Sequence, residues 1–237
     1  MKRFYKHVAA EKIEGGETES GWRVLLDGRP IRTAGGRAQI VPGKALAEAL
    51  AAEWAAQGAE IDPQSFPLRD LADFAADAVA PDRALAVRDM LPYAETDTLC
   101  YRGDPEDALY QRQLAVWEPL LAEAEAVHGV KFARISGVVH KPQPAETMAR
   151  LEAALTAESD FALAALKMLS SLAASLVIAL AAIRPGADAQ ALWNAANLEE
   201  DWQIELWGED WEAAERRAAR FEAFKLAIRF AELARQG

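Results

Sequence analysis

The segment from Phe161 to Ile183 is almost wholly apolar and long enough to cross a bilayer, so it must lie either in a membrane or in a protein core. It contains Lys167, Ser170 and Ser175, and alanine supplies much of its apparent hydrophobicity. A lysine near the centre of a spanning helix costs roughly 2.5–3.5 kcal/mol on insertion scales. The segment therefore predicts a buried central helix whose small residues let neighbouring helices approach closely, in a chain that does not insert into a membrane.

The composition and net charge of the chain indicate which kinds of partner it can bind. Of the 237 residues, 51% are hydrophobic and 27% are charged, which is the mix of an ordinary globular protein. The formal net charge is −11. A chain this acidic repels phosphate backbones and anionic lipid, so a nucleic acid or a membrane surface is disfavoured as a partner and a basic protein is favoured.

The only cysteine and the first residues bear on the compartment. Cys100 has no partner for a disulfide, which favours a reducing environment. The opening residues, Met1 to Lys6, form neither an apolar signal core nor an Arg- and Ser-rich transit segment. We therefore expect a protein of a bacterial cytoplasm. Nothing in the sequence suggests obligate self-association, so we expect a monomer.

The first forty residues have strand-like patterns. Asp27-Gly28 lies between two such runs and predicts a type I′ hairpin turn, because both turn residues need positive φ. Pro30 cannot donate to a strand ladder, so its strand is expected at an edge. A further turn is predicted at Gly15-Gly16. Short strands are predicted at 4–8, 22–26, 29–33 and 38–41.

The pattern then changes to helical spacing. One helix follows Pro42-Gly43 and ends near Gly58, and the connector Ile61–Pro67 is interrupted by prolines. We place a domain boundary there, which predicts an α+β fold with a β-rich domain at 1–65 and a helical domain at 66–237. Pro119 is expected to kink or split its helix. Later helices are predicted at 68–79, 82–92, 105–128, 144–157, 160–183, 187–206 and 209–234, and a strand within 130–140.

Few residues favour catalysis. The three histidines lie far apart without a ligand-spaced neighbour, so no metal site is predicted. The sequence has no Gly-rich phosphate loop and no G-x-S-x-G motif, and we predict no cofactor. The alternative is a hydrolase-type enzyme that uses Glu95 and Asp97 as a carboxylate pair or Cys100 as a nucleophile. Neither has a partner base or a substrate loop beside it in the sequence.

The segment from Tyr93 to Arg102 also has a structural explanation. Asp97 or Thr96 would cap a turn, and Arg102 would pair with a nearby acid. Cysteine is more often buried than catalytic, which suits Cys100. We favour this structural explanation over the enzyme hypothesis.

A second polar cluster runs from Leu198 to Trp211. Between Glu199 and Glu215 the sequence has eight carboxylates and neither Lys nor Arg. If 187–206 forms one helix, the acids at 199–205 lie near its C-terminus and oppose the helix dipole, so helix stability does not explain them. Aromatic rings among like charges suit a protein-binding surface. The alternative is a solvated acidic face over tryptophans that point into the core.

Several stretches of the chain together resemble the assembly chaperones for the α subunit of F1-ATPase in mitochondria and α-proteobacteria. The matching stretches, in chain order, are 3–6 (RFYK), 26–33 (LDGRPIRT), 53–57 (EWAAQ), 61–63 (IDP), 93–102 (YAETDTLCYR), 113–120 (QLAVWEPL) and 199–210 (EEDWQIELWGED). The chain departs from the family at Thr33-Ala34, where Thr-Pro is usual, and at Phe66-Pro67, where Met-Pro is common. Both departures are local.

The resemblance implies a small β-rich domain joined to a larger helical one, which agrees with the strand and helix patterns. It also implies a non-catalytic holdase that binds the unassembled α subunit of F1-ATP synthase, shields the surface that β later covers, and is displaced as the ring forms. Eukaryotic relatives act in the mitochondrial matrix. In the family, function is associated with an acidic segment that matches the Glu199-Glu200 pair here. We therefore predict partner binding by Glu199, Glu200, Trp202, Gln203, Trp207 and Asp97.

Overall fold

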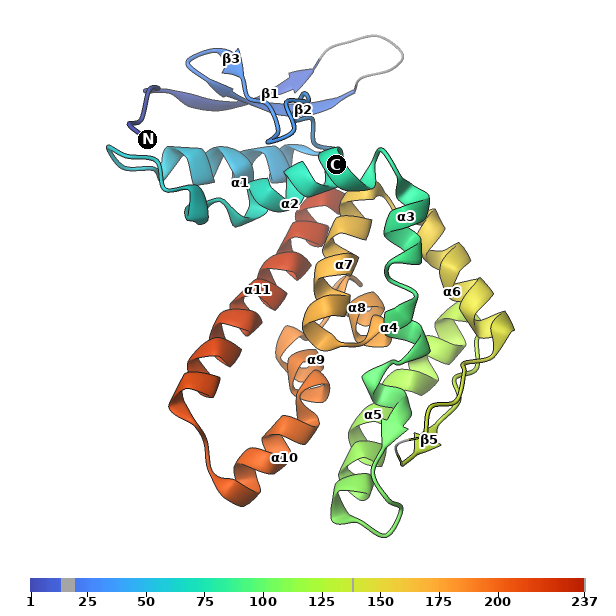
Figure 1. Ribbon diagram of the computed structural model, residues 1–237. Helices are drawn as coiled ribbons and strands as arrows, with labels where there is room; N and C mark the ends of the chain where they lie inside the picture. Colours follow the sequence, from blue (N-terminus) through green and yellow to red (C-terminus); the bar gives the residue numbers. More distant parts are fainter. Residues whose placement is uncertain (14–19, 138, 237) are drawn as a thin grey trace. The chain divides into compact units, whose positions relative to one another are not determined.

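The computed structural model describes residues 1–13, 20–137 and 139–236, and its contacts group the chain into two compact units. The first unit takes Met1–Arg83, Ser159–Ala165 and Arg229–Gly237, and the second takes Ala84–Glu158 and Leu166–Ile228. The observed fold is α+β, as predicted, with a small strand region near the N-terminus and helices in most of the remainder (Figure 1). These units assign residues 66–83 to the N-terminal part, and the sequence-based bounds 1–65 and 66–237 stay a prediction.

An antiparallel sheet with the strand order β1-β2-β3 forms the start of the first unit. Its strands are β1 (Val8–Ile13), β2 (Gly21–Leu26) and β3 (Arg29–Pro30). The predicted hairpin turn is confirmed, because Asp27 and Gly28 have φ values of 48° and 78°. Pro30 lies on the edge strand, also as predicted. The predicted Gly15-Gly16 turn lies outside the described residues.

The strand predicted at 4–8 is wrong, because strand pairing begins only at Val8. The backbone N–H groups of Lys6 and His7 donate to the carboxylate of Asp27 instead of to a neighbouring strand. Tyr5 points inward, and its hydroxyl donates a 2.7 Å hydrogen bond to the carbonyl of Trp54. The predicted strands 29–33 and 38–41 are shorter than expected: the first ends at Pro30, and the second contributes only isolated bridges.

A helix predicted after Pro42-Gly43 is confirmed as α1 (Lys44–Ala55), which packs against β1 and β2. A 3-10 turn (Pro63–Ser65), α2 (Pro67–Phe74) and a π-helical turn (Ala75–Val79) follow it. A small core lies between the sheet and these helices. It consists of Tyr5, Leu26, Ile61 and Phe66, with Val8, Ile31 and Trp54 packed against it.

The remaining helices follow the predicted order but are divided more finely. They are α3 (Arg83–Arg88), α4 (Pro92–Glu95), α5 (Ala108–His128), α6 (Ala145–Ala157), α7 (Asp160–Ala173), α8 (Leu176–Ala182), α9 (Ala189–Ala196), α10 (Leu198–Trp207) and α11 (Trp211–Arg235). Pro119 was predicted to kink or split its helix; α5 runs unbroken through it, so the split is wrong and the kink stays a prediction. Pro119 and Ala115 are both exposed, and water can therefore satisfy the carbonyl that the proline leaves unbonded.

The apolar segment 161–183 is mostly buried, as predicted, but it is two helices rather than one. Ala174 adopts a φ of 48°, which ends α7, and the Ser175 hydroxyl accepts a 3.0 Å hydrogen bond from the N–H of Ile178 to start α8. Every residue of α8 except Ala181 is buried. Among the described residues, no helix combines the length and the apolar character needed to cross a membrane.

The predicted helix 187–206 is also two helices, because the backbone leaves the helical conformation at Asn197. The buried amide of Asn197 donates a 2.8 Å hydrogen bond to the carbonyl of Trp193 and closes α9. Helix α10 therefore begins at Leu198. The acids expected at a helix C-terminus instead form a first turn, which corrects the sequence-based placement of Glu199 and Glu200.

A short parallel pairing lies in the second unit. Strand β4 (Tyr101–Arg102) pairs with β5 (Ile135–Ser136), so the strand predicted within 130–140 is confirmed and its partner is one that the sequence did not predict. This pairing brings the segment around Tyr101 next to the segment around Ile135.

Candidate functional site

The acidic cluster lies on α10 and the turn that follows it. Glu199, Glu200 and Asp201 occupy the first turn of α10, where the unbonded N–H groups give the helix end a partial positive charge. Acidic side chains there stabilise the helix by roughly 0.3–1 kcal/mol each. Their position is therefore compatible with local stability, unlike the position that the sequence predicted.

Two of the carboxylates have basic partners from other helices. Arg112 of α5 makes two contacts of 2.6 and 2.8 Å with Glu205, and Arg217 of α11 lies 2.5 Å from Asp201. The sequence run contains no basic residue, but the fold supplies these two to α10, and Arg216, just past the run, lies 3.6 Å from Glu212. Arg112 and Arg217 were missed from the sequence, since their carboxylate partners lie 93 residues away for Arg112 and on the preceding helix for Arg217.

Glu199 is held by a buried amide. Gln113 of α5 accepts a 2.9 Å hydrogen bond from the N–H of Gly103 through Oε1, so its Nε2 points the other way and donates to Glu199 Oε1 at 2.7 Å. Gln113 is fully buried, which fixes this orientation. Glu200 is half-exposed, and among the described residues the structure records no hydrogen bond or ion pair for its side chain.

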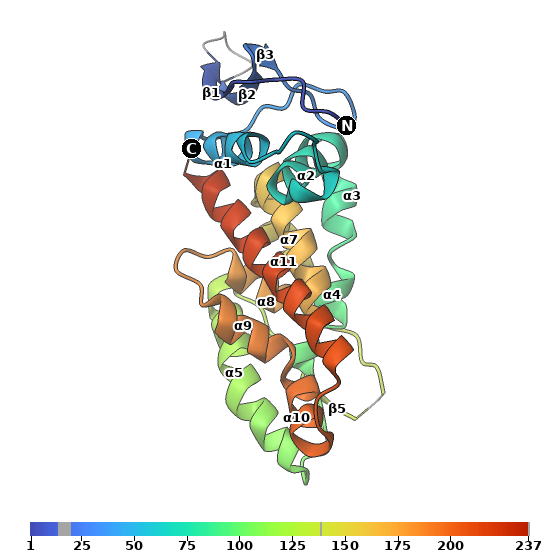
Figure 2. The same cartoon turned by 90° about the vertical axis from the view of Figure 1, so that its left-hand side faces the viewer.

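The tryptophans of this region do not face the core as a group. Trp207 and Trp211 are 77% and 72% exposed, and Leu206 beside them is 56% exposed. Figure 2 shows the turn that joins α10 to α11, at which Gly208 has a φ of 89°. Trp202 is half-buried and lies under the guanidinium of Arg112, 5.7 Å from the ring centre. The arrangement contradicts the alternative of a solvated acidic face over core-facing rings.

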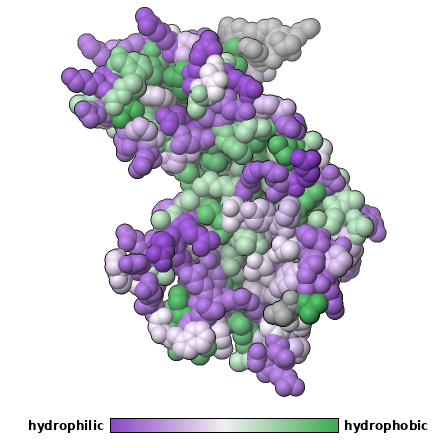
Figure 3. Space-filling view, in the orientation of Figure 1, coloured by the Kyte–Doolittle hydropathy of each residue, from purple (hydrophilic) through white to green (hydrophobic). Residues whose placement is uncertain are grey.

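We call Glu199, Glu200, Trp202, Gln203 and Trp207 the α10 surface. In Figure 3, the area around α10 and the start of α11 mixes hydrophilic residues with paler residues of intermediate hydropathy and some hydrophobic ones. Gln203 and Glu199 are exposed. The surface thus offers large aromatic area beside carboxylates, a combination suited to binding a basic protein surface.

A groove adjoins the α10 surface. It has a volume of about 510 Å³ and is lined by Thr96, Thr98, Tyr101, His140 and Glu199. The groove joins the two polar clusters of the sequence, because four of these side chains come from the 93–102 segment and its β5 neighbour region. His140 was not predicted to take part, since its neighbours in sequence carry no signal.

Asp97, predicted as a partner contact, is fully buried. Its carboxylate accepts hydrogen bonds from the N–H groups of Leu99 (3.0 Å) and Val177 (2.9 Å), so both oxygens hold the fold together. Burial raises the pKa of Asp97 to about 6. The structural explanation of this segment is confirmed, because Asp97 caps the 3-10 turn Thr98–Cys100 and Arg102 pairs with Glu118 at 2.6 Å.

The residues considered for catalysis do not share an open site. Cys100 is fully buried, and burial raises the pKa of its thiol to about 12. Glu95 is half-buried and accepts a 3.2 Å hydrogen bond from the N–H of Gln143. Within the described ranges, no three His, Cys, Asp or Glu side chains are grouped in a way that could hold a metal ion.

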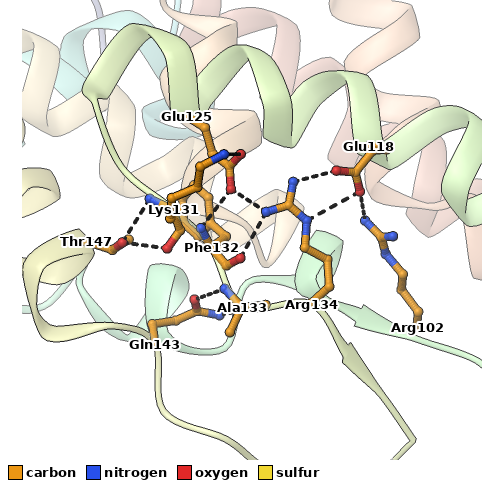
Figure 4. Close-up of polar contacts among 9 residues, drawn as sticks. All are labelled: Arg102, Glu118, Glu125, Lys131, Phe132, Ala133, Arg134, Gln143 and Thr147. Carbon is orange, nitrogen blue, oxygen red and sulfur yellow. Dashed lines mark hydrogen bonds and ion pairs between the residues drawn. The ribbon is translucent and has the colours of Figure 1, made fainter.

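A network of ion pairs fixes the segment that leads to His140 (Figure 4). Arg134 contacts Glu118 at 2.6 Å and also pairs with Glu125, and Glu125 accepts a 2.9 Å hydrogen bond from the N–H of Phe132. Glu118 lies between Arg134 and Arg102 and so links Arg102 of β4 to the residue that precedes β5. The network attaches residues 131–134 to α5, next to β5, whose Ile135 pairs with the groove residue Tyr101.

Comparison with known proteins gives a consistent result. The family model described as ATP12 chaperone protein matches residues 2–125. The crystal structure of Atp12 from Paracoccus denitrificans is 36% identical with a TM-score of 0.91, over 98% of each chain. A point mutant of P. denitrificans Atp12p matches with the same identity and TM-score, over 98% of this chain and 97% of that one. The Atu1473 protein from Agrobacterium tumefaciens is 38% identical with a TM-score of 0.90, over 98% of this chain and 85% of that one.

Proposed function

The chain belongs to the ATP12 chaperone family, and from this premise we propose that it binds the unassembled α subunit of F1-ATP synthase and promotes F1 assembly. Membership of a chaperone family implies a protein partner. The α subunit as that partner is supported by the seven stretches that resemble α-subunit chaperones over nearly the whole chain. In this proposal the protein acts by binding alone, without catalysis or a cofactor.

The binding site in this proposal is the α10 surface. The observation that carries it is the exposure of Trp207, at 77%, at the end of the same helix whose first turn carries the carboxylates of Glu199 and Glu200. An exposed aromatic ring keeps apolar surface in contact with water, which is unfavourable. Covering that ring with a partner removes this surface from water and favours binding. We leave Asp97 out of the surface, because a fully buried side chain cannot touch a partner.

The chemistry of this surface suits temporary binding. Charges contribute selectivity and fast association more than raw affinity, and a few aromatic anchors provide most of the binding energy. Such an interface holds the α subunit until β offers a larger complementary surface. We further propose that the protein works as a monomer in a bacterial cytoplasm, a compartment that suits its free thiol at Cys100.

The test is the affinity of purified α subunit for the wild-type chain and for two charge-reversal variants. Glu200→Lys places a cation on the α10 surface, and Glu152→Lys makes the same change at an exposed site on α6. Losing a charge contact of this kind costs about 2–5 kcal/mol, so Glu200→Lys should weaken binding about 30-fold or more, while Glu152→Lys should not.

Two results would contradict the proposal in different ways. If the wild-type chain does not bind the α subunit, the function is wrong. If Glu200→Lys binds as tightly as Glu152→Lys at every salt concentration, the α subunit is bound elsewhere. Melting temperatures of both variants check that each remains folded.

A further inference from the structure

The hydroxyl groups of the groove all use their protons within the protein. Thr96 Oγ1 donates to the carbonyl of Pro92 at 3.0 Å, and Thr98 Oγ1 donates to the carbonyl of Ala174 at 2.8 Å. A hydroxyl has one proton and two lone pairs. Each threonine therefore offers the groove only its acceptor lone pairs.

Tyr101 also offers the groove only acceptor lone pairs, because its proton is directed to His140. The Tyr101 hydroxyl lies 2.7 Å from His140 Nδ1, and His140 Nε2 lies 3.6 Å from Glu95 Oε1. We assign the proton of the neutral ring to Nε2, which faces this carboxylate, and with that tautomer Nδ1 is the acceptor and Tyr101 is the donor. Burial, with Glu95 adding to it, raises the pKa of Tyr101, which keeps the phenol protonated. The phenol oxygen then presents lone pairs to the groove.

Glu199 adds a fixed negative charge to this set. Gln113 donates to Oε1 at 2.7 Å, which orients the carboxylate and leaves Oε2 without a recorded contact. The groove is therefore lined by four oxygen acceptors from Thr96, Thr98, Tyr101 and Glu199. None of the five lining residues is Lys or Arg.

We propose that this groove binds the guanidinium group of an arginine side chain on the protein partner. This inference rests on the proposed function, since it names the chemistry of the contact that the adjoining α10 surface makes. Several acceptors with one carboxylate suit a planar cation with five N–H donors and no acceptor, whereas an ammonium offers three donors from one point. An acidic side chain would place its oxygens against the oxygens of the groove, and a neutral amide or hydroxyl could donate hydrogen bonds but would not neutralise the charge of Glu199.

A small-molecule probe tests the groove without the α subunit. Nα-acetyl-arginine amide is titrated into the ¹⁵N-labelled chain in the millimolar range, with the citrulline and lysine analogues as matched controls. Citrulline has the same shape as arginine but is neutral. We expect the arginine probe to shift the amide signals of Thr98, Tyr101 and Gly103, with at least about fivefold tighter binding than either control. Equal binding of the citrulline or lysine probe would overturn the assignment.

Substitutions then connect the probe to the groove. Glu199→Gln removes the charge and keeps an oxygen for Gln113, and Tyr101→Phe removes one acceptor. Each should weaken the arginine probe and the α subunit about five- to tenfold, and Glu152→Lys should weaken neither. If the probe depends on these residues but the α subunit does not bind the wild-type chain, the groove stands and the proposed function fails. If the α subunit binds and neither substitution affects it, the groove proposal is wrong.

Discussion

Nε2 of the buried Gln113 donates a 2.7 Å hydrogen bond to Oε1 of Glu199, across 86 positions of sequence. The other end of the same amide accepts from the N–H of Gly103. One side chain thus orients a carboxylate of the α10 surface and satisfies the backbone that follows β4. The orientation of the Glu199 carboxylate at the surface therefore depends on Gln113, a buried residue that a partner cannot contact.

Replacement of Gln113 should therefore lower the stability of the fold, because both ends of its amide are hydrogen-bonded. Gln113→Leu leaves the Gly103 N–H without its acceptor and should lower the free energy of unfolding by about 1–3 kcal/mol. The matched control is Gln111→Leu on the exposed side of α5, which should stay within about 0.5 kcal/mol of wild type. Urea denaturation measures both, and equal effects would show that the bridge contributes nothing.

Two tryptophans should respond in opposite ways to truncation. Trp117 is fully buried and donates a 2.8 Å hydrogen bond to the Ala195 carbonyl, so Trp117→Ala should cost about 3–5 kcal/mol of stability. Trp207 is 77% exposed, so Trp207→Ala should change stability by less than about 0.5 kcal/mol. Its effect should instead appear in α-subunit binding, about 30-fold for an aromatic anchor. Unchanged binding would remove Trp207 from the proposed surface.

Acid should weaken the network around Glu118. The hydrogen bonds from Arg134 and Arg102 hold the pKa of Glu118 at about 2, below its usual 4.5. A lowered native pKa stabilises the fold above the unfolded pKa, and the contribution is lost as the pH falls from 4.5 towards 2. The stability difference between wild type and Glu118→Gln should be largest above pH 4.5 and shrink below it. A difference that stays constant over this range would contradict the assignment.

Asp97 should show the opposite pH dependence. Burial raises its pKa from 3.8 to about 6, so its contribution to stability is fully present below pH 3.8 and is lost as the pH rises through 6. Stability measured at intervals across this window should therefore favour wild type over Asp97→Asn most strongly at the acid end. Asp97→Asn should also destabilise the fold throughout, because the amide cannot accept from both Leu99 and Val177.

Cys100 should be inert in the native state. Its thiol is fully buried and has a pKa raised to about 12, and thiol reagents act on the exposed thiolate. We expect no labelling at pH 8 in buffer and complete labelling in denaturant. Cys100→Ala should retain α-subunit binding. Rapid labelling of the folded chain, or loss of binding in a folded variant, would revive a role for the thiol.

Features that depend on neighbouring residues were predictable from the sequence. The Asp27-Gly28 turn, the Asp97 cap and the edge position of Pro30 all follow from backbone preferences of one or two residues. The helix breaks at Ala174 and Asn197 were not predictable in this way, because neither residue is a strong helix breaker. The break at Ala174 is supported by a distant contact, since its carbonyl accepts from Thr98, 76 positions earlier, and the break at Asn197 depends on whether its side-chain amide turns back to the carbonyl of Trp193.

The site was predictable in part for the same reason. The carboxylates and tryptophans of the α10 surface are adjacent in sequence, so their pattern was visible. Gln113, Arg112 and His140 join them only through tertiary contacts, and their own neighbours give no sign of it. Asp97 was misplaced because a polar residue in a polar segment looks exposed until packing shows which carboxylate is buried.

The break at Asn197 has a consequence for how this surface can evolve. Selection for partner binding often favours residues that destabilise the fold. Many acidic residues near the C-terminal end of a helix would be one such conflict. Because a new helix starts at Leu198, selection for acidic residues at 199–201 and selection for a stable helix act in the same direction. Charge can therefore vary among carboxylates at these positions without compensating mutations, whereas a lysine there would be opposed by both pressures. An insertion that made α9 and α10 one continuous helix would place these acids away from a helix N-terminus. Selection for acidic residues and selection for helix stability would then oppose each other, although the same residues would remain on the surface.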